Sequence, residues 1–162
     1  MGRALSRVVE NLDKIFRWMS CASLFIMAIV TLTDIAMRTA GRPIVGSLEL
    51  VTFLGAFVIG FALPYTTWLK GHVYVDVLVD KLSPKGKKVF MVITRIMGIA
   101  LFLFATYDFI LYGLTNIKSG EVTPSFRIPL YPIAFGLAAS FFLQSLTLLC
   151  ELLQVVKGDQ GD

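Results

Sequence analysis

The chain has 162 residues, of which 56% are hydrophobic and 16% are charged, and its formal net charge is +4. An ordinary soluble domain has about 45–50% apolar and about 25% charged residues, and a small one cannot bury this much apolar side chain. The composition therefore argues against a small soluble domain and, with a mean hydropathy of +0.76, indicates a membrane protein.

Four stretches of the chain are long and apolar enough to cross a membrane. We expect them at residues 18–37, 48–69, 89–114 and 128–150. Two contain uncharged runs, Leu50–Leu69 and Ile128–Cys150, and about 20 helical residues cross a hydrocarbon core of roughly 30 Å. Because lipid offers no partner to free backbone groups, and the runs lack the alternation of a barrel, each should be helical. The predicted fold is an all-α integral membrane protein, a single four-helix domain over residues 1–162.

The segment before the first span is charged and amphipathic. Its apolar residues recur at helical spacing: Leu5, Val8, Val9, Leu12, Ile15 and Phe16. This pattern does not fit a cleavable export signal. It predicts a helix that lies on the inner membrane face or extends the first span into the cytoplasm, and a solvated helical leader is an equal alternative.

The distribution of lysine and arginine predicts the orientation of the spans. One side holds Arg3, Arg7, Lys14, Arg17, Lys70, Lys81, Lys85, Lys87, Lys88 and Lys157. The other side holds Arg38, Arg42, Lys118 and Arg127. The positive-inside rule then places both termini in the cytoplasm. This asymmetry also explains the net charge, and no groove of arginine and aromatic residues indicates nucleic acid as a partner.

The inner loop between the second and third spans contains a second amphipathic pattern. One helical face carries Val75, Leu78, Val79 and Leu82, and another carries Asp76 and Asp80. We expect a short helix along the inner surface, although alternating valines also permit a strand with unpaired edges. The lysines after Pro84 should reach anionic phospholipid headgroups.

Few residues of this chain could bind a cofactor or a metal. The histidine is His72, and the cysteines are Cys21 and Cys150. A lone interfacial histidine could carry a proton but is more often structural. Both cysteines map near cytoplasmic helix ends, where thiols stay reduced. We therefore predict no disulfide, metal site, cofactor or catalytic residue.

The outer loop before the fourth span contains three prolines, Pro124, Pro129 and Pro132. Each fixes one backbone angle and biases its predecessor to extended structure, so the loop should be rigid. Pro129 and Pro132 are expected in the first turn of the fourth helix, where a missing amide donor costs little.

Small and polar residues repeat every four positions on two spans. One stripe comprises Ala56, Gly60 and Pro64, and the other comprises Gly136, Ser140 and Gln144. Small residues let helix backbones approach closely in lipid, so these stripes predict internal packing seams. A second stripe on residues 48–69, formed by Phe53, Phe57 and Phe61, could face lipid, a neighbouring helix or a partner protein.

Six charged residues are candidates for structural or subunit contacts: Asp34, Arg38, Glu49, Arg95, Asp108 and Arg127. All except Arg95 map near outer span ends, where we expect an ion-pair network that holds the helices together. A path for ions or substrate is the functional alternative, but no carboxylate maps near mid-membrane, where secondary transporters usually bind. Arg95 should either reach the inner surface or pair with Glu151.

Three short motifs stand in a fixed order on this four-span frame. Gly46-Ser47-Leu48-Glu49-Leu50 opens the second span, Gly71-His72-Val73 comes before Val75-Asp76, and Thr123-Pro124 comes before Arg127-Ile128-Pro129. Together they resemble the small membrane subunit, of the DctQ type, of tripartite ATP-independent periplasmic (TRAP) transporters. Tyr74, between the two valines, is a minor departure from many members.

The resemblance implies a role that the residues alone do not show. In this family a periplasmic binding protein captures an organic acid, and a large membrane subunit carries it inward by a sodium-coupled elevator movement. The small subunit would brace the static part of the large subunit in the bacterial inner membrane. On this reading the six charged residues serve structure or subunit contact, and sodium coupling belongs to the large subunit.

Three other functions are weighed against this role, and each needs a feature of its own. A free-standing four-helix exporter would need a coupling carboxylate deep in a span, and Asp34 maps near an outer end. A membrane anchor of a respiratory-type enzyme would need paired haem ligands, usually histidines, and this chain has one. An intramembrane hydrolase would need a nucleophile and a base at the same depth, and Ser140 has no such partner in any span.

Overall fold

The computed structural model describes residues 2–68 and 84–157, and within them the chain forms four α-helices. They are α1 (Gly2–Thr39), α2 (Ser47–Trp68), α4 (Pro84–Ser119) and α5 (Tyr131–Lys157). Each is long and apolar enough to cross a membrane. In the described part of the chain, the β structure is limited to one bridge between Val122 and Pro129.

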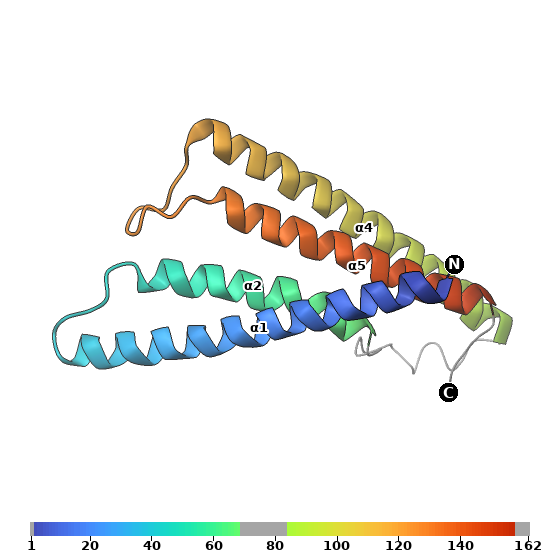
Figure 1. The fold of residues 1–162 in the computed structure, drawn as a ribbon, viewed down its shortest axis with the longest axis horizontal. Helices are drawn as coiled ribbons and strands as arrows, with labels where there is room; N and C mark the ends of the chain where they lie inside the picture. Colours follow the sequence, from blue (N-terminus) through green and yellow to red (C-terminus); the bar gives the residue numbers. More distant parts are fainter. Residues whose placement is uncertain (1, 69–83, 158–162) are drawn as a thin grey trace.

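The helices form two antiparallel hairpins, α1 with α2 and α4 with α5 (Figure 1). The hairpins converge at the end where α1 begins and α5 finishes, which we call the termini end, and they diverge at the loop end. Helix α5 packs against all three other helices, whereas α4 packs chiefly on α5. Accordingly, 56% of the α5 span is buried, against 6% of the α4 span. The fold is therefore an open arrangement built around α5.

All four predicted spans are confirmed as helices, and most helices are longer than predicted. Helix α1 has 38 residues, or about 57 Å, so it is nearly twice as long as the hydrocarbon core. The segment before the first span is thus an extension of that helix. Val9 in it is only 1% exposed and packs with Leu143 and Cys150 of α5, so a solvated leader is wrong.

The start of α5 differs from the prediction. Pro132 lies in the first turn as expected, but Pro129 lies before the helix, because it pairs with Val122 in the isolated bridge. That bridge holds the backbone extended, and the amide of Thr123 donates to the carbonyl of Ile128 at 3.0 Å. Helix α5 therefore begins at Tyr131, after the predicted boundary at residue 128. The inner-surface helix or strand expected at 73–82, together with His72, lies outside the described residues.

The small-residue stripes form the seam between α2 and α5, as predicted. A Cβ on Gly60 would lie 2.5 Å from the side chain of Leu137, so glycine allows this close approach. Two residues of the phenylalanine stripe face neighbouring helices: Phe61 meets Phe16 of α1 edge-on at 5.0 Å between ring centroids, and Phe57 lies beside Gly136 of α5. The seam therefore joins α1, α2 and α5.

Candidate functional site: polar contacts around helix α5

Pro64, in the middle of this seam, leaves one backbone carbonyl of α2 in need of a hydrogen-bond donor. It lies inside α2 and has no amide hydrogen, so the carbonyl of Gly60, four residues earlier, loses its helical donor. In a membrane such a carbonyl needs another donor. The hydroxyl of Ser140 on α5 supplies it by donating to that carbonyl. The α2–α5 contact thus repairs a break in the hydrogen bonds of α2.

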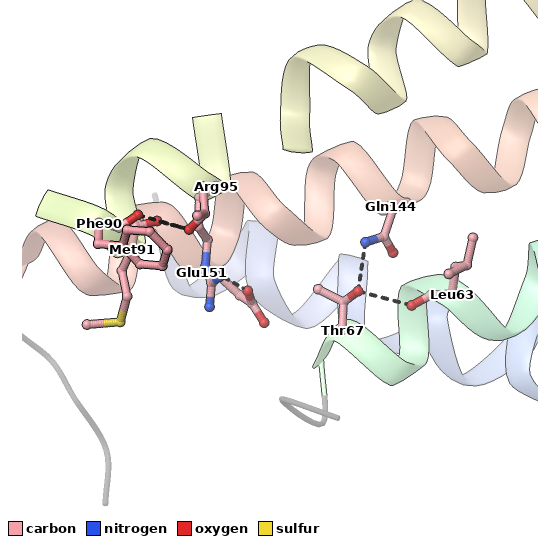
Figure 2. A network of polar contacts seen from close by, with 8 residues as sticks. Leu63, Thr67, Phe90, Met91, Arg95, Gln144 and Glu151 are labelled. Atoms are coloured by element: carbon pink, nitrogen blue, oxygen red, sulfur yellow. Dashed lines mark hydrogen bonds and ion pairs between the residues drawn. The ribbon is translucent and has the colours of Figure 1, made fainter. Parts of the chain in front are cut away.

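A second polar contact lies further along both helices, about one turn on α5 and about two turns on α2. The amide nitrogen of Gln144 donates to the hydroxyl oxygen of Thr67 at 2.7 Å, and Thr67 donates to the carbonyl of Leu63 at 3.1 Å (Figure 2). Gln144 is 1% exposed and Thr67 is 2% exposed. These two buried side chains extend the polar seam toward the termini end.

Helix α1 joins the same seam through a buried carboxylate. Asp13 is fully buried, and both of its carboxylate oxygens lie 3.3 Å from the hydroxyl of Thr147 on α5. Further along α1, Ser20 donates to the carbonyl of Val58 on α2 at 2.9 Å. The polar contacts therefore link α5 to both helices of the first hairpin.

Sequence reasoning missed Asp13, Ser20, Thr67 and Thr147. A signal was present: Val9, Asp13, Phe16 and Ser20 recur at the spacing of one helical face, so Asp13 occupies a position of the apolar stripe. A polar residue on such a stripe indicates a buried partner on another helix.

Arg95 pairs with Glu151, which is one of the two predicted alternatives. The guanidinium Nε of Arg95 lies 3.0 Å from a carboxylate oxygen of Glu151, and each side chain is 11% exposed (Figure 2). The pair joins α4 to α5 near the termini end. Glu151 follows Gln144 by seven residues, so the ion pair continues the polar face of α5 and adds a contact to α4.

Arg17 makes a further contact at the termini half of the first hairpin. Its guanidinium donates to the hydroxyl of Tyr65 at 2.7 Å and lies 4.5 Å from the centre of that ring. Such a cation over an aromatic ring adds an electrostatic attraction to the hydrogen bond. The contact ties α1 to α2 near the level of Thr67.

At the loop end, the predicted charged residues form two separate contacts. Asp34 pairs with Arg38 at 2.8 Å, and its other carboxylate oxygen accepts the amide of Ile44 at 3.0 Å. This carboxylate therefore holds the α1–α2 loop.

Glu49 makes the other contact at this end, and it crosses between the hairpins. It accepts the backbone amides of Ser125 at 2.9 Å and Phe126 at 3.3 Å. Phe126 lies beside Gly46, whose φ of +84° suits glycine, and a Cβ there would come within 2.5 Å of the ring. Glu49 thus attaches the α4–α5 loop to the start of α2.

Asp108 and Arg127 do not join these contacts. Both are exposed, and within the described residues neither forms an ion pair. Arg127 instead occupies a left-handed turn, with φ of 52°, and its amide donates to the carbonyl of Thr123. Four of the six predicted charged residues therefore form side-chain contacts, at three separate places in the structure. The side chains of the other two are exposed.

Charged residues and metal-binding side chains are sparse in the middle of the described helices. Within the described residues, no three metal-binding side chains cluster. No Asp, Glu, Lys or Arg occurs between residues 18 and 33, 50 and 67, 96 and 107, or 128 and 150. Ionisable groups are thus concentrated toward the two ends of the bundle.

The chain was compared with known proteins. Residues 27–158 match the family model described as tripartite ATP-independent periplasmic transporters, DctQ component. Neither the curated proteins nor the solved structures gave a match. The match covers most of the chain, and the four apolar helices agree with a multi-pass protein of the inner membrane. The chain belongs to the DctQ family, the small membrane component of TRAP transporters.

Proposed function

We propose that this chain is a non-catalytic subunit that braces the large membrane subunit of a TRAP transporter for organic acids. It binds no substrate or coupling ion itself, and sodium coupling takes place in the large subunit. The observation that carries the proposal is the contrast between the ends and the middle of the helices. Polar and ionic contacts hold the four helices together, whereas their central segments contain no Asp, Glu, Lys or Arg that could bind a solute.

Exposed apolar faces supply surface for a large partner. On α4, Met97, Leu101 and Phe104 lie on one face and are 67%, 64% and 66% exposed. On α1, Trp18, Phe25 and Leu32 form a comparable stripe that is 67–69% exposed. Some of this surface meets lipid and some meets the large subunit. Because α4 packs chiefly on α5, its other side is free to contact either lipid or the large subunit.

The proposal also includes the orientation of the helices across the membrane. With most lysines and arginines at the termini end, both termini lie in the cytoplasm, and the loop end faces the periplasm. The α4–α5 loop is then on the side where the periplasmic binding protein delivers its organic acid. The six charged residues predicted from the sequence serve structure or subunit contact.

Co-purification from membranes tests the bracing role. The large membrane subunit, expressed together with this chain, should be recovered with it in mild detergent. We then expect tryptophan at Leu101 on α4 or at Leu32 on α1 to reduce recovery, because lipid accommodates a larger side chain whereas a packed protein interface does not.

Two controls make this experiment decisive. The variant chains purified alone should unfold at the wild-type temperature, because both positions are exposed. Recovery of this chain as a stable homo-oligomer, with no large subunit bound, would contradict the proposal and favour a free-standing exporter.

A further inference from the structure

Helix α4 lies at the edge of the bundle and carries two stripes of residues on different sides (Figure 1). One stripe faces α5, where Phe102 and Phe109 lie 5.9 and 5.3 Å from the ring of Phe141, measured between centroids. The second, which we call the outer stripe, has the same spacing of three and four residues. It comprises Met97, Leu101, Phe104, Asp108, Leu111 and Thr115, and all six are exposed. The outer stripe therefore has the pattern of a helix–helix contact, yet the described helices leave it uncovered.

Asp108 is the acidic residue of the outer stripe, and it lies inside the apolar span of α4. The span ends at Ser119, eleven residues later, so Asp108 lies about 16 Å along the helix from that end. No hydrogen bond or ion pair reaches its carboxylate from the described residues. The nearest Asp, Glu, Lys or Arg residues on α4 are Arg95 and Lys118. Asp108 is therefore an isolated carboxylate on an otherwise apolar face.

A carboxylate in this position requires a partner outside the described chain. Lipid acyl chains supply no hydrogen-bond donor, and acidic side chains within membrane spans almost always pair with another group or face protein. Long side chains such as lysine and arginine can extend to the membrane surface, but aspartate is too short to cross three helical turns. The outer stripe should therefore meet a protein that offers a positive charge at the level of Asp108.

A second copy of this chain does not meet this requirement. Two copies share one orientation in the membrane, so a symmetric contact through the outer stripe would place Asp108 opposite Asp108, where the carboxylates repel each other. The other spans contain no Lys or Arg between residues 18 and 33, 50 and 67, or 128 and 150. The chemistry therefore requires a different protein, with a basic side chain inside an apolar helix.

We propose that the outer stripe of α4 docks on a helix of the large membrane subunit, and that a lysine or arginine of that helix pairs with Asp108. This inference rests on the proposed function and adds the contact face and the charge that aligns it. One polar residue in a helix–helix seam fixes how two helices align, because a shifted alignment leaves it unpaired. Asp108 therefore sets the register, and the apolar residues of the outer stripe supply the contact area.

Co-expression with the large subunit tests the charge pair. Asp108→Leu should lower recovery of the large subunit in mild detergent at least about tenfold, because the partner's cation is left buried without a carboxylate. Asp108→Asn can still accept a hydrogen bond and should lower recovery less. Purified alone, the Asp108→Leu chain should unfold at or above the wild-type temperature, since Asp108 has no partner in the described chain. Glu121→Leu removes an exposed carboxylate beyond the end of α4 and should leave recovery unchanged.

Photo-crosslinking identifies the partner helix. A benzoylphenylalanine in place of Phe104, one turn before Asp108, should crosslink to the large subunit in membranes. The crosslinked peptide should contain a lysine or arginine within an apolar segment. Asp108→Lys alone should prevent recovery of the complex, and exchanging that basic residue for glutamate in the same cells should restore it.

The possible outcomes separate this inference from the proposed function. Wild-type recovery with Asp108→Leu, or crosslinks from position 104 to lipid alone, would overturn the docking face while leaving the bracing role intact. A crosslinked helix without a basic residue would overturn the charge pair. A wild-type chain that binds no large subunit would overturn the proposed function and this inference together.

Discussion

At the scale of single residues, the structure shows how one backbone defect specifies a helix contact. Pro64 removes the donor that the carbonyl of Gly60 needs, and Ser140 of α5 replaces it. Leu137, one turn away on α5, packs directly on Gly60. A proline, a glycine and a serine therefore fix which faces of α2 and α5 meet, because any other register would leave the carbonyl of Gly60 without a donor.

Ser140→Ala should lower the stability of the purified chain by about 1 kcal/mol, since the carbonyl of Gly60 then lacks a donor. Ser145→Ala is a matched control, because the hydroxyl of Ser145 donates within its own helix, to Phe142. In a Pro64→Ala background the restored backbone amide can donate to Gly60, so Ser140→Ala should cost less. Denaturant titration of the double-mutant cycle measures this difference. An equal cost in both backgrounds would show that the hydroxyl of Ser140 does not replace the proline's missing donor.

Arg95→Leu should destabilise the α4–α5 contact by about 3–5 kcal/mol, because it leaves Glu151 buried without its ionic partner. Arg95→Lys keeps a positive charge and should cost less. The double variant Arg95→Leu with Glu151→Leu should recover most of the loss, since two apolar side chains need no compensation in lipid. Thermal unfolding of the four proteins in detergent measures these effects. If Leu and Lys variants were equally stable, the ion pair would contribute little.

At the scale of helices, the contact between the hairpins at the loop end depends on Glu49. The two hairpins diverge there, and the α4–α5 loop reaches back to the start of α2 (Figure 1). Two backbone amides of the loop converge on this carboxylate. The loop therefore limits how far the hairpins can separate.

Glu49→Ala should let the hairpins separate further at the loop end, because both loop amides lose their acceptor. Spin labels placed at exposed positions Leu48 and Val122 would report a longer and broader distance distribution. Asp108→Asn is the control, because Asp108 is exposed and forms no ion pair in the described chain, and it should leave the distance unchanged. Unchanged distances in the Glu49 variant would mean that helix packing alone sets the angle.

The helices were predictable from the sequence because each span is a long, mainly apolar stretch with at most two charged residues, and lipid leaves a helix as the stable structure. Their ends were less predictable, since a helix continues beyond the hydrocarbon core wherever polar side chains can reach water, as α4 does back to Pro84. The late start of α5 depends on a bridge to Val122, which is a long-range pairing that local pattern cannot show.

The contacts among the candidate residues were only partly predictable. The spacing of Asp34 and Arg38 indicates a pair within one helix, and that pair is present. The acceptor role of Glu49 toward Ser125 and the burial of Asp13 depend on how separate helices approach each other. No local pattern contains that information.

At the scale of the whole molecule, α5 is the central helix, and α1 and α4 each leave one side uncovered. Helix α5 is buried by its three neighbours, whereas α1 and α4 keep long apolar faces exposed. The Asp, Glu, Lys and Arg residues lie toward the helix ends and are absent from the central segments. These features suit a subunit that extends the membrane contact of a larger transporter.

Reconstituted transport tests this account most directly. Liposomes containing this chain alone, the large subunit alone, or both are supplied with a sodium gradient and with the binding protein loaded with its organic acid. If the chain braces the large subunit and carries no solute itself, this chain alone should give no uptake, and uptake should be highest when both subunits are present. Gradient-driven uptake by this chain alone would contradict it.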